Sequence, residues 1–185
     1  NALDPAGELA VDDFGIAGEQ VLHAVQARDG RGDEAVGRGD DDSQVAARRV
    51  PVVVMHNQRG RASSDVIASV LEGLRESLRI AAAAGVPAGR VIADPGFGFG
   101  WTPAQNIEML RRFGELQALG VPLLAGTSRK STIGTVLGGA PVEERAFGTA
   151  ATVALAIAAG ADIVRVHDVA AMKQVALVAD AAVRG

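Results

Sequence analysis

Short apolar runs alternate with longer segments of helical periodicity from residue 50 to the end of the chain. Each apolar run is long enough for a buried strand, and the segments between them carry apolar residues at helical spacing. The pattern predicts strands at 50–56, 91–93, 123–126 and 162–166, and helices at 66–84, 103–119, 131–137, 149–159 and 170–183. Strands that alternate with helices are typical of a parallel sheet with right-handed crossovers. The sequence therefore predicts an α/β fold of parallel βα repeats.

The first 49 residues differ in composition from the rest. Of 22 acidic and 18 basic side chains in the chain, 11 acidic and 5 basic ones lie in 1–49, together with Gly- and Asp-rich runs that are typical of loops. Only 16–25 has the pattern of a short amphipathic helix there. The acidic run at 40–42 lacks the spacing of a calcium loop, which leaves a solvated loop or a weak cation site. We expect 1–49 to be a poorly ordered segment of unknown role and 50–185 to be the folded domain.

The composition argues against several classes of protein. The chain has no cysteine and three histidines, which excludes disulfides and thiolate chemistry and argues against a zinc site. The longest uncharged apolar stretch, 148–161, is shorter than the roughly 20 residues that cross a bilayer. A net charge of −4, 3% aromatic residues and no basic run argue against nucleic acid. With no secretion signal, a cytoplasmic protein that binds small molecules is expected.

Polar side chains follow the predicted strands at their carboxyl ends. Asp94 follows the second predicted strand, Lys130 lies in the loop after the third, and Arg165 and His167 lie at the end of the fourth. Because the carboxyl ends of parallel strands meet at one edge, these groups are expected to share one rim. A carboxylate, an ammonium, a guanidinium and an imidazole together suit a polar ligand that carries phosphate.

Several motifs in this order resemble one enzyme family. They are Met55-His56, Asp94-Pro95-Gly96-Phe97-Gly98-Phe99-Gly100, Gln105-Asn106, Thr127-Ser128-Arg129-Lys130-Ser131, Gly148-Thr149-Ala150 and Arg165-Val166-His167-Asp168-Val169. Together they resemble dihydropteroate synthase, from about Val50 to the end of the chain. The resemblance implies a TIM-barrel-type fold, of which the chain would supply strands five to eight of a (β/α)8 barrel after an irregular N-terminal segment.

The resemblance also implies an activity. The family condenses 6-hydroxymethyl-7,8-dihydropterin pyrophosphate with p-aminobenzoate, releases pyrophosphate, and uses Mg2+. The family's first strand carries an Asn segment for that metal, and no such segment is found in 1–49. No metal ligand is therefore assigned here, and impaired turnover is expected of this polypeptide alone. The family also implies a homodimer, in which helices of this half form the contact.

Three catalytic roles follow from the resemblance. Lys130 would hold the pterin ring, and Arg165 and His167 would bind the pyrophosphate and stabilise its charge as it leaves. Alternation along a strand would point these last two side chains to the same side. A plain surface lysine is the alternative for Lys130.

Further residues are assigned to the two organic substrates. Asp94 would accept hydrogen bonds from the pterin, or would be a turn residue before a proline. Gly126 would let the backbone approach the pterin. Met55 and Phe99 would line the pterin pocket or would be core. Ser131, with Phe99, would bind the p-aminobenzoate carboxylate at a helix start, or would cap that helix.

Other residues near these motifs have weaker assignments. His56 is either a ligand-binding or a structural histidine, Arg59 could join the phosphate end, and His23 has no expected role. Where the family often has Lys, this chain has Trp101, which is expected to remove a charge from the rim.

Two questions stay open at this stage. The chain could be a C-terminal fragment or carry an altered reading frame in 1–49, or two copies could pair through the first and last predicted strands, which would be open edges. The function could also be that of a non-catalytic pterin-binding or interaction fragment. A corrinoid-linked methyltransferase pterin domain is a third candidate.

Overall fold

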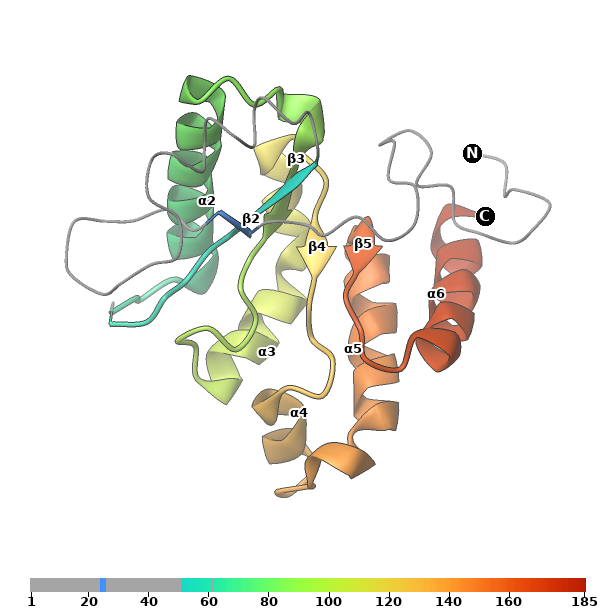
Figure 1. Ribbon diagram of the computed structural model, residues 1–185. Coiled ribbons are helices and arrows are strands. Elements are labelled where there is room, and N and C mark those ends of the chain that lie inside the picture. Colours follow the sequence, from blue (N-terminus) through green and yellow to red (C-terminus); the bar gives the residue numbers. More distant parts are fainter. Residues whose placement is uncertain (1–23, 26–50, 61) are drawn as a thin grey trace.

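The protein was analysed as a computed structural model that describes residues 24–25, 51–60 and 62–185 (Figure 1). Its strands are β1 (Ala24–Val25), β2 (Val52–Met55), β3 (Val91–Asp94), β4 (Leu124–Ala125) and β5 (Ile163–Val164). The helices are α2 (Val66–Ala83), α3 (Pro103–Arg111), α4 (Ser131–Val136), α5 (Ala146–Ala158) and α6 (Val169–Arg184). Short 3₁₀ helices lie at η2 (Ala88–Arg90), η3 (Phe113–Leu119) and η4 (Val142–Glu144). The predicted α/β fold of parallel repeats is confirmed.

The described strands are all parallel. β2 pairs with β3 from Val52 opposite Val91 to Met55 opposite Asp94, and β4 pairs with β5. A parallel bridge between Ala93 and Leu123 joins the two groups. Strands that run in one direction and meet in register place their carboxyl ends at a common edge.

A fifth strand, β1, pairs with β2 and was not expected from the sequence. Ala24 and Val25 lie opposite Val53 and Val54. The short helix predicted at 16–25 is therefore wrong for its last two residues, and the rest of it lies outside the described residues. The first predicted strand is not an open edge, because β1 occupies that side. Sheet pairing between distant segments overrides the local helical pattern here.

The two faces of the sheet have different neighbours. One face packs against the helices, and its buried side chains form the main core with residues of α2, α3 and η3, including Leu74, Met109 and Phe113. Alternate strand residues form a second row of Val53, Ile92 and Leu124, with Ile163 packed against it. Because successive side chains of a strand point to opposite faces, the helices cover one face while this apolar row lies on the other.

α2 and α3 begin at the predicted residues, whereas α3 ends earlier than predicted. Asp65 caps α2 by accepting from the backbone N–H groups of two residues, and Thr102 forms a capping box with Gln105 at the start of α3. The single helix predicted over 103–119 is instead α3 followed by η3, with a break at Arg112. The tighter turns of η3 fit the fully buried Phe113 beneath the sheet.

The remaining elements differ from expectation only at their ends. α5 begins at Ala146, earlier than predicted, and β4 and β5 are shorter than the apolar runs that contain them. The sequence also predicts the end of a helix over 44–49, and that segment lies outside the described residues. Among the described helices, none combines the length and apolar character needed to cross a bilayer.

Candidate active site

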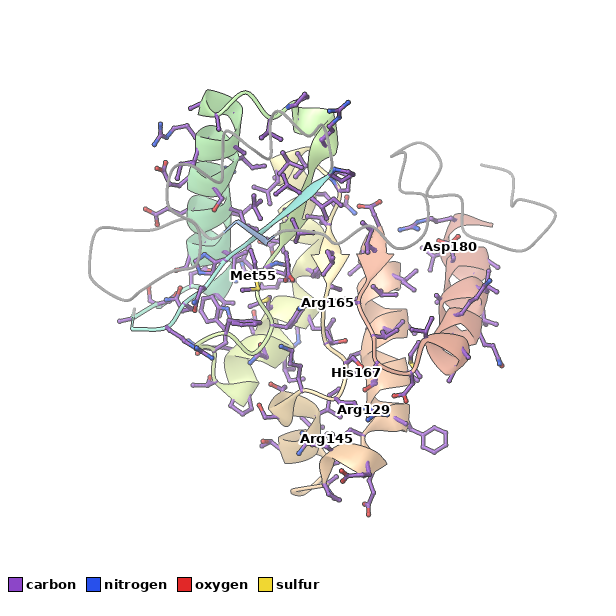
Figure 2. The ribbon with its side chains drawn as sticks, in the orientation of Figure 1. Met55, Arg129, Arg145, Arg165, His167 and Asp180 are labelled. Carbon is purple, nitrogen blue, oxygen red and sulfur yellow. The ribbon has the colours of Figure 1, made fainter. Side chains whose placement is uncertain are left out.

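The carboxyl edge of the sheet brings together the side chains expected from the motifs. Met55 and Asp94 face each other at the ends of β2 and β3. Arg165 follows β5, and its backbone N–H donates to the carbonyl of Ala125 on β4 (3.1 Å). Figure 2 shows Arg165, His167 and Arg129 along the segments that leave β4 and β5. The groups expected at one rim therefore share it.

Asp94 is the buried acid of this site. Its side chain is 5% exposed, one oxygen accepts from the backbone N–H of Gly96 (2.8 Å), and the other lies 3.8 Å from the Arg165 guanidinium. Burial raises the pKa of Asp94, while the Gly96 N–H and the charges of Arg165 and Lys130 oppose that rise. Asp94 thus acts as a turn residue through its bond with Gly96, as one of the two alternatives from the sequence expected. Its second oxygen faces the guanidinium of Arg165.

Lys130 is tied to this cluster rather than free on the surface. Its ammonium lies 4.5 Å from the centre of the half-buried Phe99 ring, and the Arg59 guanidinium lies 5.8 Å from the same centre. Partial burial, together with the positive charge of Arg165, lowers the pKa of Lys130, and the Asp94 carboxylate opposes this. The site therefore holds cationic groups next to one acid and one aromatic ring.

Gly126 makes room for Arg165. A Cβ atom at this position would lie 3.1 Å from a guanidinium nitrogen of Arg165. The side chain of Arg165 is 61% exposed, so it rests on the backbone of the β4 end and is open on its other side. Within the described residues, the close neighbour of Gly126 is thus the arginine.

Ser128 belongs to one of the motifs, but the sequence predicts no role for it. Its hydroxyl lies 2.9 Å from Nδ1 of His167 and accepts from the backbone N–H of the same residue (3.1 Å). The next residue, Arg129, forms an ion pair with Asp168, which lowers the pKa of that carboxyl. A serine in a loop carries no local signal for this role, because its partner lies 39 residues away.

Residues at the start of α5 also form hydrogen bonds with the loop after β4. Arg129 has a left-handed backbone, with φ of 54°, which costs energy for a residue other than glycine. Its N–H donates to the fully buried Thr149 hydroxyl (3.0 Å), and its carbonyl accepts from Arg145 (3.0 Å). Two further contacts therefore fix the conformation that presents Lys130.

His56 and Trp101 pack together in the interior. Both are buried, their rings stack at 5.7 Å, and His56 bonds Gln58 (2.9 Å). A Cβ atom at Gly73 of α2 would overlap the imidazole at 2.1 Å, so the histidine points into the helix layer. The geometry supports the structural assignment of His56. Trp101 is buried because an apolar indole gains free energy by burial. That it removes a charge from the rim stays a prediction.

Ser131 is the first residue of α4 and is exposed. The residue in the capping position is Lys130, and no side chain caps this helix. The capping role considered for Ser131 is therefore wrong. Its substrate role stays a prediction.

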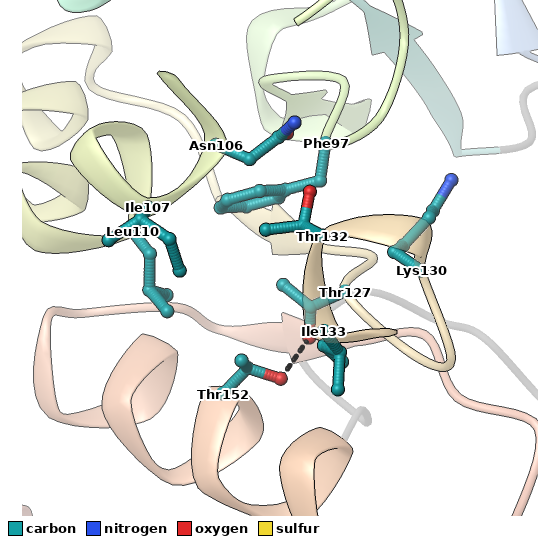
Figure 3. Close-up of a pocket in the computed structure, with 9 residues that line it drawn as sticks. All are labelled: Phe97, Asn106, Ile107, Leu110, Thr127, Lys130, Thr132, Ile133 and Thr152. Atoms are coloured by element: carbon teal, nitrogen blue, oxygen red, sulfur yellow. Dashed lines mark hydrogen bonds between the residues drawn. The ribbon is translucent and has the colours of Figure 1, made fainter. Parts of the chain in front are cut away.

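A small cavity of about 20 Å³ lies beside the site. It is lined by apolar residues of α3 and α4 and by the hydroxyls of Thr127 and Thr152, which bond each other at 2.9 Å. In Figure 3 the ammonium of Lys130 points away from the apolar lining. A space of this size holds about one water. A small organic ligand therefore does not fit inside it, and the open rim is the candidate binding region.

The part of the chain that the structure describes shows no ready-made metal site. No group of three or more His, Cys, Asp or Glu side chains lies close enough to hold a metal ion in that part of the chain. Asp94 is engaged by a backbone N–H and a guanidinium instead. The acidic run at 40–42 lies outside the described residues, and His23 does too.

Comparison with known families identifies this arrangement. The model of the pterin binding enzyme family matches residues 32–167. The chain belongs to the pterin binding enzyme family. The match begins inside 1–49, earlier than the resemblance near Val50 that the motifs carry, and it includes the Asp94, Lys130, Arg165 and His167 positions.

Similar proteins of this family are dihydropteroate synthases, which confirms the resemblance. The chain is 45% identical to that of Bacillus subtilis over 139 residues, which is 75% of this chain and 48% of the relative. It is 43% identical to that of Clostridium beijerinckii over 146 residues, 78% and 54% of the two chains. The chain thus spans about half the length of the curated relatives it matches.

Solved structures of this family agree with the fold. The dihydropteroate synthase of Xanthomonas albilineans, solved with 7,8-dihydropteroate, matches with a TM-score of 0.74 and 41% identity over 78% of this chain and 55% of that one. That of Coxiella burnetii, solved with pteroic acid, matches with a TM-score of 0.73 and 37% identity over 78% and 56%. The pterin binding enzyme described here is therefore of the TIM-barrel type.

Proposed function

We propose that this pterin binding enzyme takes part in dihydropteroate synthesis. In that reaction the amine of p-aminobenzoate attacks the exocyclic carbon of the pterin, the C–O bond breaks, pyrophosphate leaves, and the amine loses a proton. The observation that supports this most is the cluster of Asp94, Lys130 and Arg165, because a buried acid beside two cations can serve a polar heterocycle and an anionic leaving group.

Each part of the cluster has a task in the proposal. Asp94 accepts the amino and ring N–H groups of the pterin, and Lys130 holds the ring. Arg165 and His167 bind the pyrophosphate and stabilise the negative charge that develops on the breaking C–O bond. The 61% exposure of the Arg165 side chain leaves it accessible to such an anion.

The remaining assignments complete the two organic pockets. Met55, half-buried at the end of β2, and Gly126 at the end of β4 border the pterin. Phe99, whose ring has Lys130 and Arg59 near it, borders p-aminobenzoate, whose carboxylate Ser131 contacts. The exposed position of Ser131 at the start of α4 is compatible with this contact.

We also propose that 50–185 forms a partial barrel in which β2 to β5 are strands five to eight. The solved relatives are matched over 55% and 56% of their chains, which supports a half-length correspondence. The apolar row of Val53, Ile92, Leu124 and Ile163 has the character of an inner barrel layer. A cytoplasmic location and a role for Mg2+ stay predictions.

Calorimetric titration of the polypeptide with 6-hydroxymethylpterin tests the proposed function. Binding in a one-to-one ratio is expected, and pyrophosphate is expected to bind the same folded protein. Folded polypeptide that binds neither ligand would refute the assignment. Binding of both without p-aminobenzoate binding would favour a pterin site of another enzyme class.

Steady-state turnover by this polypeptide is expected to be at least about a hundredfold below that of a full-length relative, because it matches only about half of such a relative and single charge-stabilising groups contribute factors of this size. The assay follows pyrophosphate release with both substrates and Mg2+ present. Turnover equal to that of the Bacillus subtilis enzyme would refute the expected impairment, but not the assigned substrates.

A homodimer through α5 is proposed on the basis of exposed apolar side chains. Phe147 is 90% exposed and Leu155, two turns later on the same face, is 57% exposed. Single exposed apolar residues are common, but aligned ones on one helix favour an interface. Phe147→Asp is expected to weaken self-association at least about tenfold in sedimentation velocity, as loss of an interface anchor does.

The matched control for this change is Ala104→Asp. It places the same charge on an exposed residue in the first turn of α3, where an acid suits the helix dipole. A monomeric wild type would refute the dimer. A dimer unaffected by Phe147→Asp would show that α5 is not the interface.

A further inference from the structure

The segments after β4 and β5 keep the register of the strands beyond the last paired residues. Leu124 lies opposite Ile163 in the sheet, an offset of 39 residues. The same offset recurs in the contact of Ser128 with His167 and in the ion pair of Arg129 with Asp168. Side-chain contacts therefore keep the pairing of the two segments in register after the backbone pairing of β4 with β5 has ended. They extend it to His167, which faces the proposed pyrophosphate.

The surroundings of Ser128 favour one direction for its side-chain hydrogen bond with His167. The backbone N–H of His167 can only donate, so Ser128 Oγ is the acceptor at 3.1 Å. Ser128 is buried, and among the described residues its hydroxyl hydrogen has one nearby acceptor, Nδ1 of His167 at 2.9 Å. If Nδ1 carried the proton instead, the buried hydroxyl hydrogen would be left without an acceptor, which is costly.

We infer that Ser128 is a positioning residue that holds neutral His167 in the tautomer protonated at Nε2. The imidazole then presents an N–H donor on its exposed edge, and it receives a hydrogen bond at the edge that faces Ser128. A donor at Nε2 suits an anion without any need for a charged imidazole. The inference about the tautomer rests on geometry alone. Its use for pyrophosphate rests on the proposed function.

The ion pair of Arg129 with Asp168 supports the same geometry. It joins the residues next to Ser128 and His167, and Thr149 and Arg145 hold the Arg129 backbone from α5. The serine therefore sits in a loop that is fixed on both sides. A loop fixed in this way can hold one ring orientation of His167.

Nitrogen-15 NMR of the full polypeptide tests the tautomer directly. At a pH well above the ordinary histidine range, the His167 signals should show a protonated Nε2 and an unprotonated Nδ1, and His167→Gln assigns them among the three histidines. Ser128→Ala should give a mixture of tautomers, and Ser128→Thr, which keeps a hydroxyl, should restore the single one. Thr127→Val is the matched control, because it removes a neighbouring buried hydroxyl that bonds Thr152 instead.

Pyrophosphate titration supplies the second readout. Ser128→Ala should weaken pyrophosphate binding roughly fivefold, the effect of losing about one hydrogen bond, and Thr127→Val should not. A wild-type His167 protonated at Nδ1, or an unchanged tautomer in Ser128→Ala, overturns the inference. Absence of pyrophosphate binding in the wild type overturns the proposed function instead. The NMR experiment still tests the tautomer of His167 in that case.

Discussion

Replacement of Asp94 by asparagine should lower pterin affinity by about a hundredfold or more without loss of stability at neutral pH. The affinity falls because the pterin would lose two charge-assisted hydrogen bonds, each worth roughly 1.5–3 kcal/mol, and 1.4 kcal/mol is tenfold. Asparagine keeps an oxygen that can accept from the Gly96 N–H. Calorimetry with 6-hydroxymethylpterin measures the affinity, and urea unfolding measures the stability.

The pH dependence of stability follows from the raised pKa of Asp94. The folded protein holds this proton more tightly than the unfolded chain, so ionisation of Asp94 costs folding free energy. That cost is absent below the ordinary aspartate pKa of about 3.9 and grows as the pH rises through the raised value. The free energy of unfolding of the Asn variant should therefore match wild type in acid and equal or exceed it at neutral pH.

Asp162→Asn is the matched control for this change. Asp162 also accepts from a backbone N–H, that of Leu123 at 2.9 Å, but it precedes β5 and lies at the opposite edge of the sheet. Its replacement should leave pterin affinity unchanged. Wild-type affinity in Asp94→Asn would contradict the pterin role, and a marked loss of stability at neutral pH would contradict the energetic account.

Gly96→Ala should destabilise the fold by at least about 3 kcal/mol, because strain and overpacking act together there. Gly96 has φ of 77°, and a Cβ atom would lie 1.9 Å from the backbone carbonyl oxygen of His56. Backbone cannot move aside as a flexible side chain can. The shift would also displace the N–H that holds Asp94, so pterin binding should be lost with stability.

Gly85→Ala separates the two causes. Gly85 has a similar φ of 84°, but no atom lies within 4 Å of its added Cβ. Gly85→Ala should therefore lower the free energy of unfolding only by the strain of a left-handed alanine, about 1–2 kcal/mol. Equal losses for the two variants in urea unfolding would show that the close approach to His56 does not matter.

Much of the fold could be predicted because the sequence patterns that specify its strands and helices are local. The apolar runs that became β2 and β3, and Thr102 before Pro103 at the start of α3, act within a few residues of themselves. The helix expected to run through residue 119 ends at Arg111 instead, and the chain continues as η3, whose Phe113 is buried in the core. Pairing of β1 was missed because register depends on the partner strand.

The meeting of the candidate residues at one edge of the sheet was predicted, but their individual contacts were not. Asp94, Lys130, Arg165 and His167 were identifiable because each follows a strand, and parallel strands bring their ends together. Ser128 carried no such signal, because a loop serine without its partner cannot be told from any other.

The sequence by itself determined the alternation of strand and helix and the chemical groups at the strand ends, because hydrophobic periodicity and motif order are properties of neighbouring residues. Only the tertiary structure decided which groups meet. The guanidinium of Arg165 lies against the backbone of Gly126. Trp101 is buried against His56, and the hydroxyl of Ser128 contacts the ring of His167. These contacts join residues far apart in the chain, and their geometry depends on the register and packing of whole elements, which no local pattern specifies.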